Sequence, residues 1–216
     1  MSRAGLQEGT LRYGVSARSY LERCAKCLRE PDLAFLFYAA LELRNCVEAR
    51  QAEYLEHYDP LRNTKVRPYR IGENAKKLTA IHNGEAIGRF EFILTSEIRL
   101  VEYYTPVPNR LKKLCEKSID LLRHAQVRFR DANAPWWGDQ RALLLEGYRL
   151  AWLACKGNIP MPPLWNQKTG ETHPVVFDQT PENTGLLRLM SENIGREFSL
   201  QVSYLDAPPR HWVPDL

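Results

Sequence analysis

Arg50 and His57 carry side chains suited to phosphate and acid–base chemistry. They are seven residues apart, nearly two helical turns, so a helix projects both from the same side. A histidine titrating near neutrality can move a proton to or from a ribose 2′-oxygen or a leaving 5′-oxygen. A guanidinium can hold the scissile phosphate through two hydrogen bonds and stabilise its developing charge. The pair therefore predicts RNA cleavage that needs no metal and no cofactor.

The same pair also has a structural interpretation. Both residues fall in the last two turns of the expected helix, where cations are favoured and an apolar stripe can emerge into water. Glu53 and Glu56 are close enough in sequence to pair with them. Burying an arginine or a histidine without hydrogen bonds is costly, so each needs a partner. At the level of sequence both interpretations stay open.

The element that must position this pair is a long helix over residues 32–57. Its apolar stripe repeats every three or four residues and comprises Leu36, Ala40, Leu43, Val47, Arg50, Tyr54 and His57. Asp32 opens this helix, and Asp59-Pro60 should end it. The polar, basic stretch that follows, RNTKVRPYRIGEN, is expected to be a loop.

Three further amphipathic patterns predict helices at 17–28, 111–129 and 140–155. Ser16 is placed to cap the first of these and Asp139 the last. The last one is apolar on most sides, as is typical of a helix in the centre of a bundle. We therefore expect a mainly α protein with a minor β part, built on an antiparallel helical bundle over residues 13–156.

The middle of the chain, at about 78–104, is expected to be a β insertion in the bundle. Asn83-Gly84 is a hairpin signal, and apolar residues alternate over 90–94 and again over 98–104. This pattern favours two or three short antiparallel strands. A helix over 88–104 is the alternative, because several of the same residues also fit one helical face.

A Gly- and Pro-rich stretch at 157–163 (GNIPMPP) is interpreted as a linker. The small α+β segment beyond it, 164–206, should pack on the bundle. It carries strand patterns at 175–177 and 197–204 and a short helical pattern near 182–194.

The composition is that of an ordinary globular chain. Of its 216 residues 44% are hydrophobic and 26% charged, and the net charge of +4 permits nucleic-acid contact without demanding it. With neither a secretory signal nor an apolar run that spans a bilayer, we expect a cytoplasmic protein without membrane contact. The five cysteines suit reduced thiols, and Cys24-x-x-Cys27 lies inside a helix, where packed thiols are favoured over zinc or redox chemistry.

Two segments carry a family resemblance. FYAALELRNCVEARQAEYLEHY resembles the long helix of the HEPN superfamily (higher eukaryotes and prokaryotes nucleotide-binding), and NRLKKLCEKSIDLLRHA is similar to a later helix of bacterial members. The resemblance covers residues 16–57 and 106–155. It implies a compact helical bundle that often dimerises. It also implies a metal-independent RNase of toxin–antitoxin, abortive-infection or CRISPR systems, or else a relative that has lost catalysis.

The RNase motif of that family is an arginine followed by a histidine after a short spacer, often with a polar residue next to the arginine. Arg50 and His57 match the longest spacer, although Gln51 stands where Asn, Asp or His is commoner. Arg44-Asn45 has the favoured opening, but no histidine follows at the required place. The resemblance therefore implies Arg50 and His57 as catalytic residues.

Further side chains are candidates for binding RNA. Arg44, Asn45 and Tyr54 share the long helix with the motif, and Trp136-Trp137 could stack on bases. The alternative for the two tryptophans is that they close one end of the bundle.

These observations lead to one leading hypothesis and two rivals. The leading hypothesis is a HEPN-like RNase or RNA-binding component of a bacterial or phage conflict system, such as toxin–antitoxin or phage defence. Its expected partners are RNA, a protein partner or antitoxin, and a second copy or a larger complex. The rivals are a non-catalytic protein- or nucleic-acid-binding subunit, and a small-molecule enzyme with its pocket between the bundle and the C-terminal segment.

Overall fold

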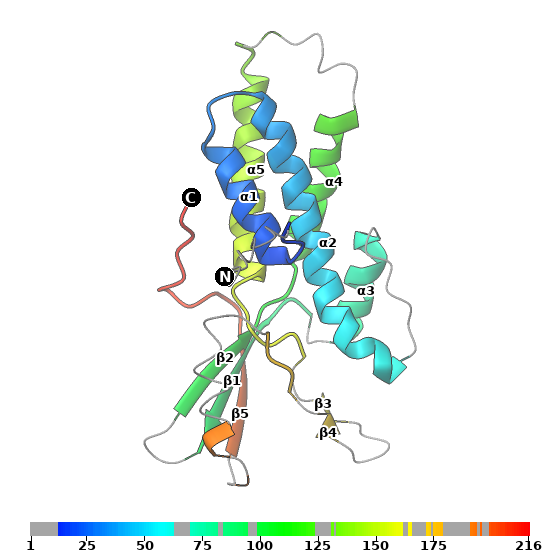
Figure 1. Cartoon of the computed structure of the whole chain (residues 1–216), viewed down its shortest axis with the longest axis vertical. Coiled ribbons are helices and arrows are strands. Elements are labelled where there is room, and N and C mark those ends of the chain that lie inside the picture. Colours follow the sequence, from blue (N-terminus) through cyan, green and yellow to red (C-terminus); the bar gives the residue numbers. More distant parts are fainter. Residues whose placement is uncertain are drawn as a thin grey trace, which may run out of the picture.

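The structure, a computed structural model, is an upright helical bundle with a small β-sheet at its lower end (Figure 1). It describes residues 13–62, 70–81, 84–94, 99–123, 131, 133–161, 164–165, 172–173, 175–178, 191–193, 195 and 199–216.

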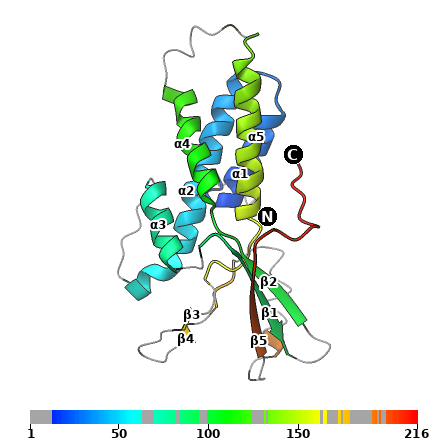
Figure 2. The ribbon, with the colours of Figure 1, turned by 180° about the vertical axis from the view of Figure 1, so that it is seen from behind.

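In the described part of the chain, the helices that run along the bundle are α1 (Ala17–Arg29), α2 (Ala34–Arg62), α4 (Asn109–Arg123) and α5 (Trp136–Ala154), and the shorter α3 (Ile71–Ile81) lies beside its lower half (Figures 1 and 2). Since α2 contacts each of the other four, it is the central element. The expectation of a mainly α fold with a minor β part is confirmed. Among the described residues, none of the helices has the combination of length and apolarity that crossing a membrane requires.

The stripe expected on the long helix is confirmed as its buried face from Leu36 to Tyr54, whereas His57 at its end is partly exposed. Leu36, Leu43, Val47, Arg50 and Tyr54 are each at most 1% exposed, so the periodicity located the core side of α2 correctly. The Asp32 carboxylate accepts from the Ala34 N–H at 2.9 Å and caps the first turn. The helix continues to Arg62, past the end expected near Asp59.

Helix α5 begins at Trp136, earlier than the expected start at residue 140. The Trp137 N–H bonds to the Ala134 carbonyl at 3.1 Å, so the turn that precedes the helix already forms at the tryptophan pair. Asp139 is therefore an acidic residue of the first turn and not the cap. Acidic side chains at this end of a helix are favoured by its dipole.

The sheet has three antiparallel strands in the order β2-β1-β5. They are β1 (Ile87–Ile93), β2 (Arg99–Tyr104) and β5 (Ser199–Leu205), and Phe90 of β1 faces Glu102 on one side and Val202 on the other. Strands are thus confirmed over the helical alternative for 88–104. A separate two-residue pair joins β3 (Leu164–Trp165) to β4 (Thr172–His173).

The C-terminal strand is not part of a separate unit, because β5 completes the same sheet as β1 and β2. In place of the strand expected at 175–177, the structure has one isolated antiparallel bridge, between Val176 and Met161. Most of the helix expected near 182–194 lies outside the described residues. After β5 the chain returns beside the bundle, where Leu216 packs against the bundle core (Figure 1).

Three local expectations need correction. Residues 71–81, assigned to a loop and the start of the β insertion, form α3, because Ile71, Ala75 and Leu78 make a buried helical stripe. Gly84, with φ of 60°, lies in the turn before β1 rather than between two strands, and Asn83 lies outside the described residues. Residues 157–161 are no linker, since Ile159 is fully buried.

Two clusters of buried side chains make up the core. The larger one fills the bundle between α1, α2, α4 and α5, and the smaller one joins the bundle to the sheet. Tyr54 of α2, Phe90 and Phe92 of β1 and Ile159 meet in the smaller cluster. The lower half of α2 is therefore enclosed by the sheet and by the segment after α5.

Candidate functional site

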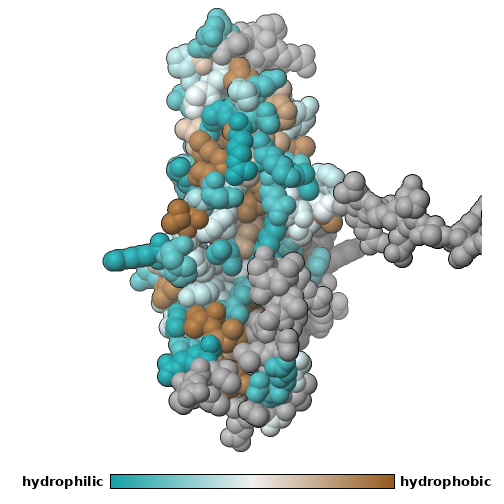
Figure 3. All heavy atoms as spheres, turned by 60° about the vertical axis from the view of Figure 1, so that its left-hand side comes forward, coloured by the Kyte–Doolittle hydropathy of each residue, from teal (hydrophilic) through white to brown (hydrophobic). Residues whose placement is uncertain are grey.

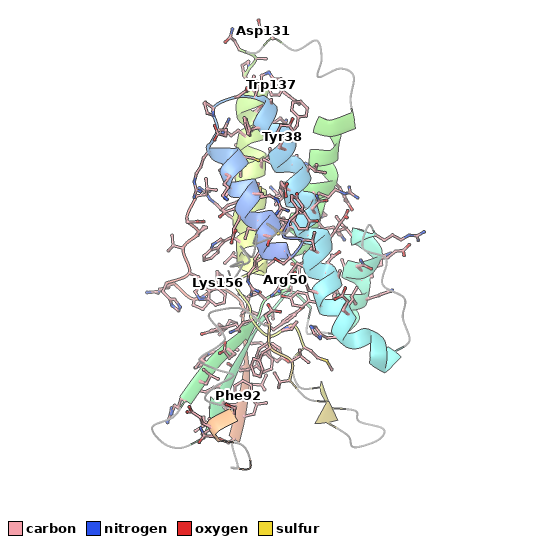
Figure 4. The ribbon with its side chains drawn as sticks, viewed as in Figure 1. Tyr38, Arg50, Phe92, Asp131, Trp137 and Lys156 are labelled. Atoms are coloured by element: carbon pink, nitrogen blue, oxygen red, sulfur yellow. The ribbon has the colours of Figure 1, made fainter. Side chains whose placement is uncertain are left out.

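Arg50 lies where the bundle meets the sheet (Figure 4), and its guanidinium is almost fully bonded. Its Nη1 donates to Glu53 Oε2 and Asp178 Oδ2, each at 3.0 Å. Its Nε donates to the Ala154 carbonyl at 3.0 Å and its Nη2 to the Gly157 carbonyl at 2.6 Å. The side chain is 1% exposed and stacks on the Tyr54 ring at 4.4 Å. In this geometry the guanidinium is not available to a phosphate.

A second arginine completes this cluster. Arg18 of α1 donates to the carbonyls of Cys155 at 3.2 Å and Gly157 at 2.9 Å, and it pairs with Asp178 at 3.0 Å. The last carbonyls of a helix have no partner within the helix and carry partial negative charge. Arg18 and Arg50 therefore cap the end of α5 with their side chains.

The charges of the cluster balance. Arg18 and Arg50 face Glu53 and Asp178, and Glu53 also accepts from the Ala17 N–H at the start of α1, at 2.7 Å. Burial alone would lower the pKa of Arg50, but the surrounding charges, Asp178 and Glu53 among them, raise it overall, so the guanidinium stays charged. The cluster links α1, α2, α5 and residue 178. Its two positive and two negative charges sum to zero.

Tyr54 contributes a second set of bonds below Arg50. Burial raises the pKa of Tyr54, so its hydroxyl stays protonated and donates to the Thr105 carbonyl at 2.5 Å. The Thr105 hydroxyl donates in turn to the Ala154 carbonyl at 2.8 Å and accepts from the Gly157 N–H at 2.9 Å. Tyr54 is thus a buried structural residue, and its ring has no surface to offer a base.

His57, the other residue of the expected catalytic pair, is partly exposed on α2. Its imidazole is not among the partners of Arg50, and the described part of the chain gives it no hydrogen bond or ion pair. The structure therefore does not bring Arg50 and His57 together in an accessible site. The buried guanidinium favours the structural interpretation of Arg50.

The other residues of the motif region on α2, Arg44, Asn45 and Gln51, also lie in structural positions. Arg44 pairs with Glu48 one turn along the helix at 2.7 Å, and Asn45 is partly buried. Gln51, which stands beside Arg50 in the motif, is completely buried, and neither its amide nitrogen nor its oxygen has a hydrogen-bond partner among the described residues. An amide in this state costs about 1–3 kcal/mol.

Trp137 lies at the far end of the bundle from Arg50 (Figure 4), and Trp136 precedes it as the first residue of α5. The Trp137 ring is 9% exposed, packs edge-on against Phe37, and donates from Nε1 to the Asp131 carbonyl at 2.9 Å. Trp136 packs edge-on against Trp137 at 4.8 Å. This arrangement favours the interpretation that the pair closes the end of the bundle.

The cysteines are free where the structure describes them, and burial raises the pKa of Cys24 and of Cys27. Thiolates are therefore disfavoured in this pair. Within the described residues, no three His, Cys, Asp or Glu side chains gather in a group that could hold a metal ion.

A cleft with a volume of about 340 Å³ lies between α1 and α5, and Arg18 is one of the residues that line it. Four basic and two acidic residues line it, together with apolar and aromatic ones: Arg18, Leu21, Glu22, Ala25, Lys26, Arg29, Tyr148, Trp152, Cys155, Lys156 and Asp215. Lys26 and Lys156 are exposed, and the Lys156 ammonium lies 5.0 Å from the Trp152 ring. The cleft combines positive charge with an aromatic ring.

The C-terminal residues border this cleft. Tyr148 donates to Asp215 Oδ1 at 2.5 Å, and Arg29 lies 3.7 Å from Asp215 Oδ2. Burial and the bond to Asp215 raise the pKa of Tyr148, which keeps its hydroxyl protonated. The end of the chain is thereby attached to both helices that form the cleft walls.

Sequence reasoning did not find the cleft or the partners of Arg50. Asp178 lies 128 residues away from Arg50, and the carbonyls of Ala154 and Gly157 carry no sequence signal at all. The cleft residues come from α1, from α5 and from the last residues of the chain, so no local spacing reveals them. Comparison of the chain with protein-family models, with curated proteins and with solved structures finds no match.

Proposed function

We propose that this chain is a HEPN-like helical bundle that binds single-stranded RNA without cleaving it. The observation that carries the proposal is the cleft between α1 and α5, which Lys26, Arg29 and Lys156 line together with Trp152, and in which the Lys156 ammonium lies over the Trp152 ring. Basic side chains attract the phosphate backbone, and an aromatic ring stacks on bases of any sequence. The conflict-system setting comes from the family resemblance.

The size and surroundings of the cleft suit this ligand. At about 340 Å³ it lies at the lower end of the range for small-molecule sites, which fits one nucleotide and excludes a duplex. On the face that carries α1, hydrophilic side chains prevail and the hydrophobic patches are small and separate (Figure 3). A polar, charged ligand fits this face better than a large apolar protein surface does.

The absence of cleavage follows from the position of Arg50. Its Nη1 and Nη2 atoms bond to carboxylates and a carbonyl inside the junction, so a scissile phosphate cannot reach them without breaking the α5 cap. Without Arg50, His57 has no second side chain beside it that is positioned to bind a phosphate. The non-catalytic form of the hypothesis therefore has the better support.

Fluorescence anisotropy with a 5′-labelled single-stranded RNA of about 12 nucleotides tests the binding. We expect a Kd of roughly 1–100 µM at near-physiological salt, weakening as salt rises, because counterion release drives the binding. Lys26→Glu and Lys156→Glu should each weaken binding about tenfold. Lys113→Glu is the matched control, because Lys113 is exposed on α4 and does not line the cleft.

The same samples, run on a denaturing gel, test for cleavage. We expect the RNA to stay intact over hours with the unmodified protein. Absence of binding at about 100 µM protein, or equal binding by all three lysine variants, contradicts the proposed site. Cleavage that disappears in a folded His57→Ala variant restores the catalytic hypothesis instead.

A further inference from the structure

The two edges of the β-sheet differ in how their backbone groups are used. At the β2 edge the Tyr103 carbonyl accepts from the N–H groups of Asn158 and Ile159, at 2.9 and 3.0 Å. The Tyr103 N–H donates to Asn158 Oδ1 at 3.2 Å. This edge is therefore closed by the segment after α5. At the other edge, β5 is the last strand, and the described residues place no further strand beside it.

The bonds of Tyr103 also fix which groups of β5 point outward. In an antiparallel pair, the backbone groups of successive residues alternate between the two sides of the strand. Since Tyr103 directs its groups away from β1, Glu102 directs its own groups toward Phe90 of β1. Phe90 thus bonds toward β2, and its partner Val202 on β5 directs its groups away from the sheet.

The same alternation applies two residues away in each direction, so Leu200 and Tyr204 also direct their N–H and C=O groups outward. The pairing of β5 with β1 runs without a bulge from Ile87 opposite Leu205 to Ile93 opposite Ser199. The open edge is therefore regular, and it presents the backbone groups of three residues in one line.

Nothing in the sequence of β5 blocks this edge. The strand SLQVSYL contains no charged residue, no proline and no glycine, although native edge strands usually carry such protection. Val202 is 46% exposed and Tyr204 54% exposed, so two large apolar side chains of the strand remain in contact with water. Both features are typical of an edge that pairs with another strand.

We propose that β5 pairs antiparallel with β5 of a second copy of this chain, with Val202 opposite itself on the two-fold axis. In this register Leu200 of each copy faces Tyr204 of the other, and all three residues exchange backbone bonds, about six in total. Residues directly opposite each other share one face, so the apolar side chains of both strands meet. The two sheets become one of six strands.

The composition of β5 favours the same strand of a second copy as its partner. A two-fold interface requires a surface that complements itself, and a short uncharged strand centred on one residue does so in the antiparallel register. A charged peptide would find no opposite charge on β5. Pairing through one strand buries less surface than a standard interface of about 1,200–2,000 Å², so we expect a weak dimer with a Kd of roughly 1–100 µM.

Sedimentation velocity of the full chain from about 5 to 300 µM tests the proposal. The unmodified protein should shift from monomer toward dimer over this range. Val202→Lys should weaken the dimer at least about tenfold, because two ammonium groups then lie opposite each other. Val202→Pro should do the same, because it removes an outward N–H and leaves the bonds to β1 intact.

Two controls make the result specific. Gln201→Lys places the same charge on the opposite face of β5 and should leave the dimer unchanged. An equimolar mixture of Val202→Lys and Val202→Glu proteins should form a heterodimer within about threefold of the original affinity, because opposite charges now face each other. Thermal unfolding by circular dichroism verifies that each variant is folded.

Formation of the heterodimer tests the register as well as the interface. Residue 202 of one copy faces residue 202 of the other only when the two-fold axis passes between them. A protein that stays monomeric at about 300 µM overturns the proposal. So does a dimer that persists in folded Val202→Lys and Val202→Pro variants, since its interface then lies elsewhere. Failure of the mixture to reassociate, or loss of the dimer in Gln201→Lys, overturns the proposed register and face.

Discussion

Replacement of Arg50 by methionine is the strongest test of how the junction is built. Methionine keeps most of the apolar stem but removes the charge, so Asp178 and Glu53 lose a buried partner, and the carbonyls of Ala154 and Gly157 each lose a donor. Breaking a buried charge pair from one side costs about 3–5 kcal/mol. Loss of the stack on Tyr54 adds about 0.5–1 kcal/mol.

We therefore expect the free energy of unfolding to fall by about 4 kcal/mol. A domain of this size changes its Tm by about 2–4 °C per kcal/mol, so Tm should fall by about 8–16 °C. Urea and thermal unfolding followed by circular dichroism at pH 7 measure both quantities. Since whole domains are stable by about 5–15 kcal/mol, most of the protein should still be folded at low temperature.

Two variants serve as matched controls for this experiment. Arg44→Met removes an arginine of the same helix whose partner is Glu48 on the next turn, and it should cost less than about 1 kcal/mol. His57→Ala should stay within about 0.5 kcal/mol, because the side chain is partly exposed and has no partner among the described residues. If Arg50→Met also stays within about 1 kcal/mol of the unmodified protein, the assignment of Arg50 as the cap of α5 is refuted.

Two further substitutions test local packing. Gly157→Ala should lower the free energy of unfolding by about 1–3 kcal/mol, because the new Cβ would lie 2.7 Å from the Thr105 backbone nitrogen and 2.8 Å from the Tyr103 carbonyl oxygen. Gly138→Ala is the control: its new Cβ meets nothing within 4 Å, so this substitution should not destabilise the protein. Gln51→Met should raise the free energy of unfolding by about 1 kcal/mol in urea unfolding, because it replaces a buried amide, to which the described part of the chain gives no hydrogen-bond partner, by an apolar side chain of similar volume. A loss of stability in Gln51→Met, or none in Gly157→Ala, contradicts the packing described at these positions.

The bundle was predictable from the sequence because its signals are local. The three- and four-residue spacing of the stripe on α2 is a property of neighbouring residues, and its apolar members Leu36, Ala40, Leu43 and Val47 lie in the core as expected. The alternation over β1 and β2 was sufficient to favour strands over a helix. Helix α3 was missed although Ile71, Ala75 and Leu78 have helical spacing, because the polar residues before them indicated a loop.

The role of Arg50 was not predictable, because its partners are distant in the sequence. Spacing alone placed an arginine on an apolar stripe, and that position suits a catalytic cation as well as a buried structural one. The distinction depends on Asp178 and on the main-chain carbonyls of Ala154 and Gly157. Likewise, no local pattern could show that the strand at 199–205 pairs with β1 rather than forming its own unit.

The late position of β5 in the chain has a consequence for how the protein is synthesised. The strand β1 leaves the ribosome more than a hundred residues before its neighbour β5 does, as does Arg50 before Asp178. The helical bundle can form during synthesis, but one edge of β1 and one face of Arg50 stay without partners until the last part of the chain emerges. A ribosome stalled before residue 178 would therefore present an exposed strand edge, and chains that end there should aggregate more readily than chains that include β5.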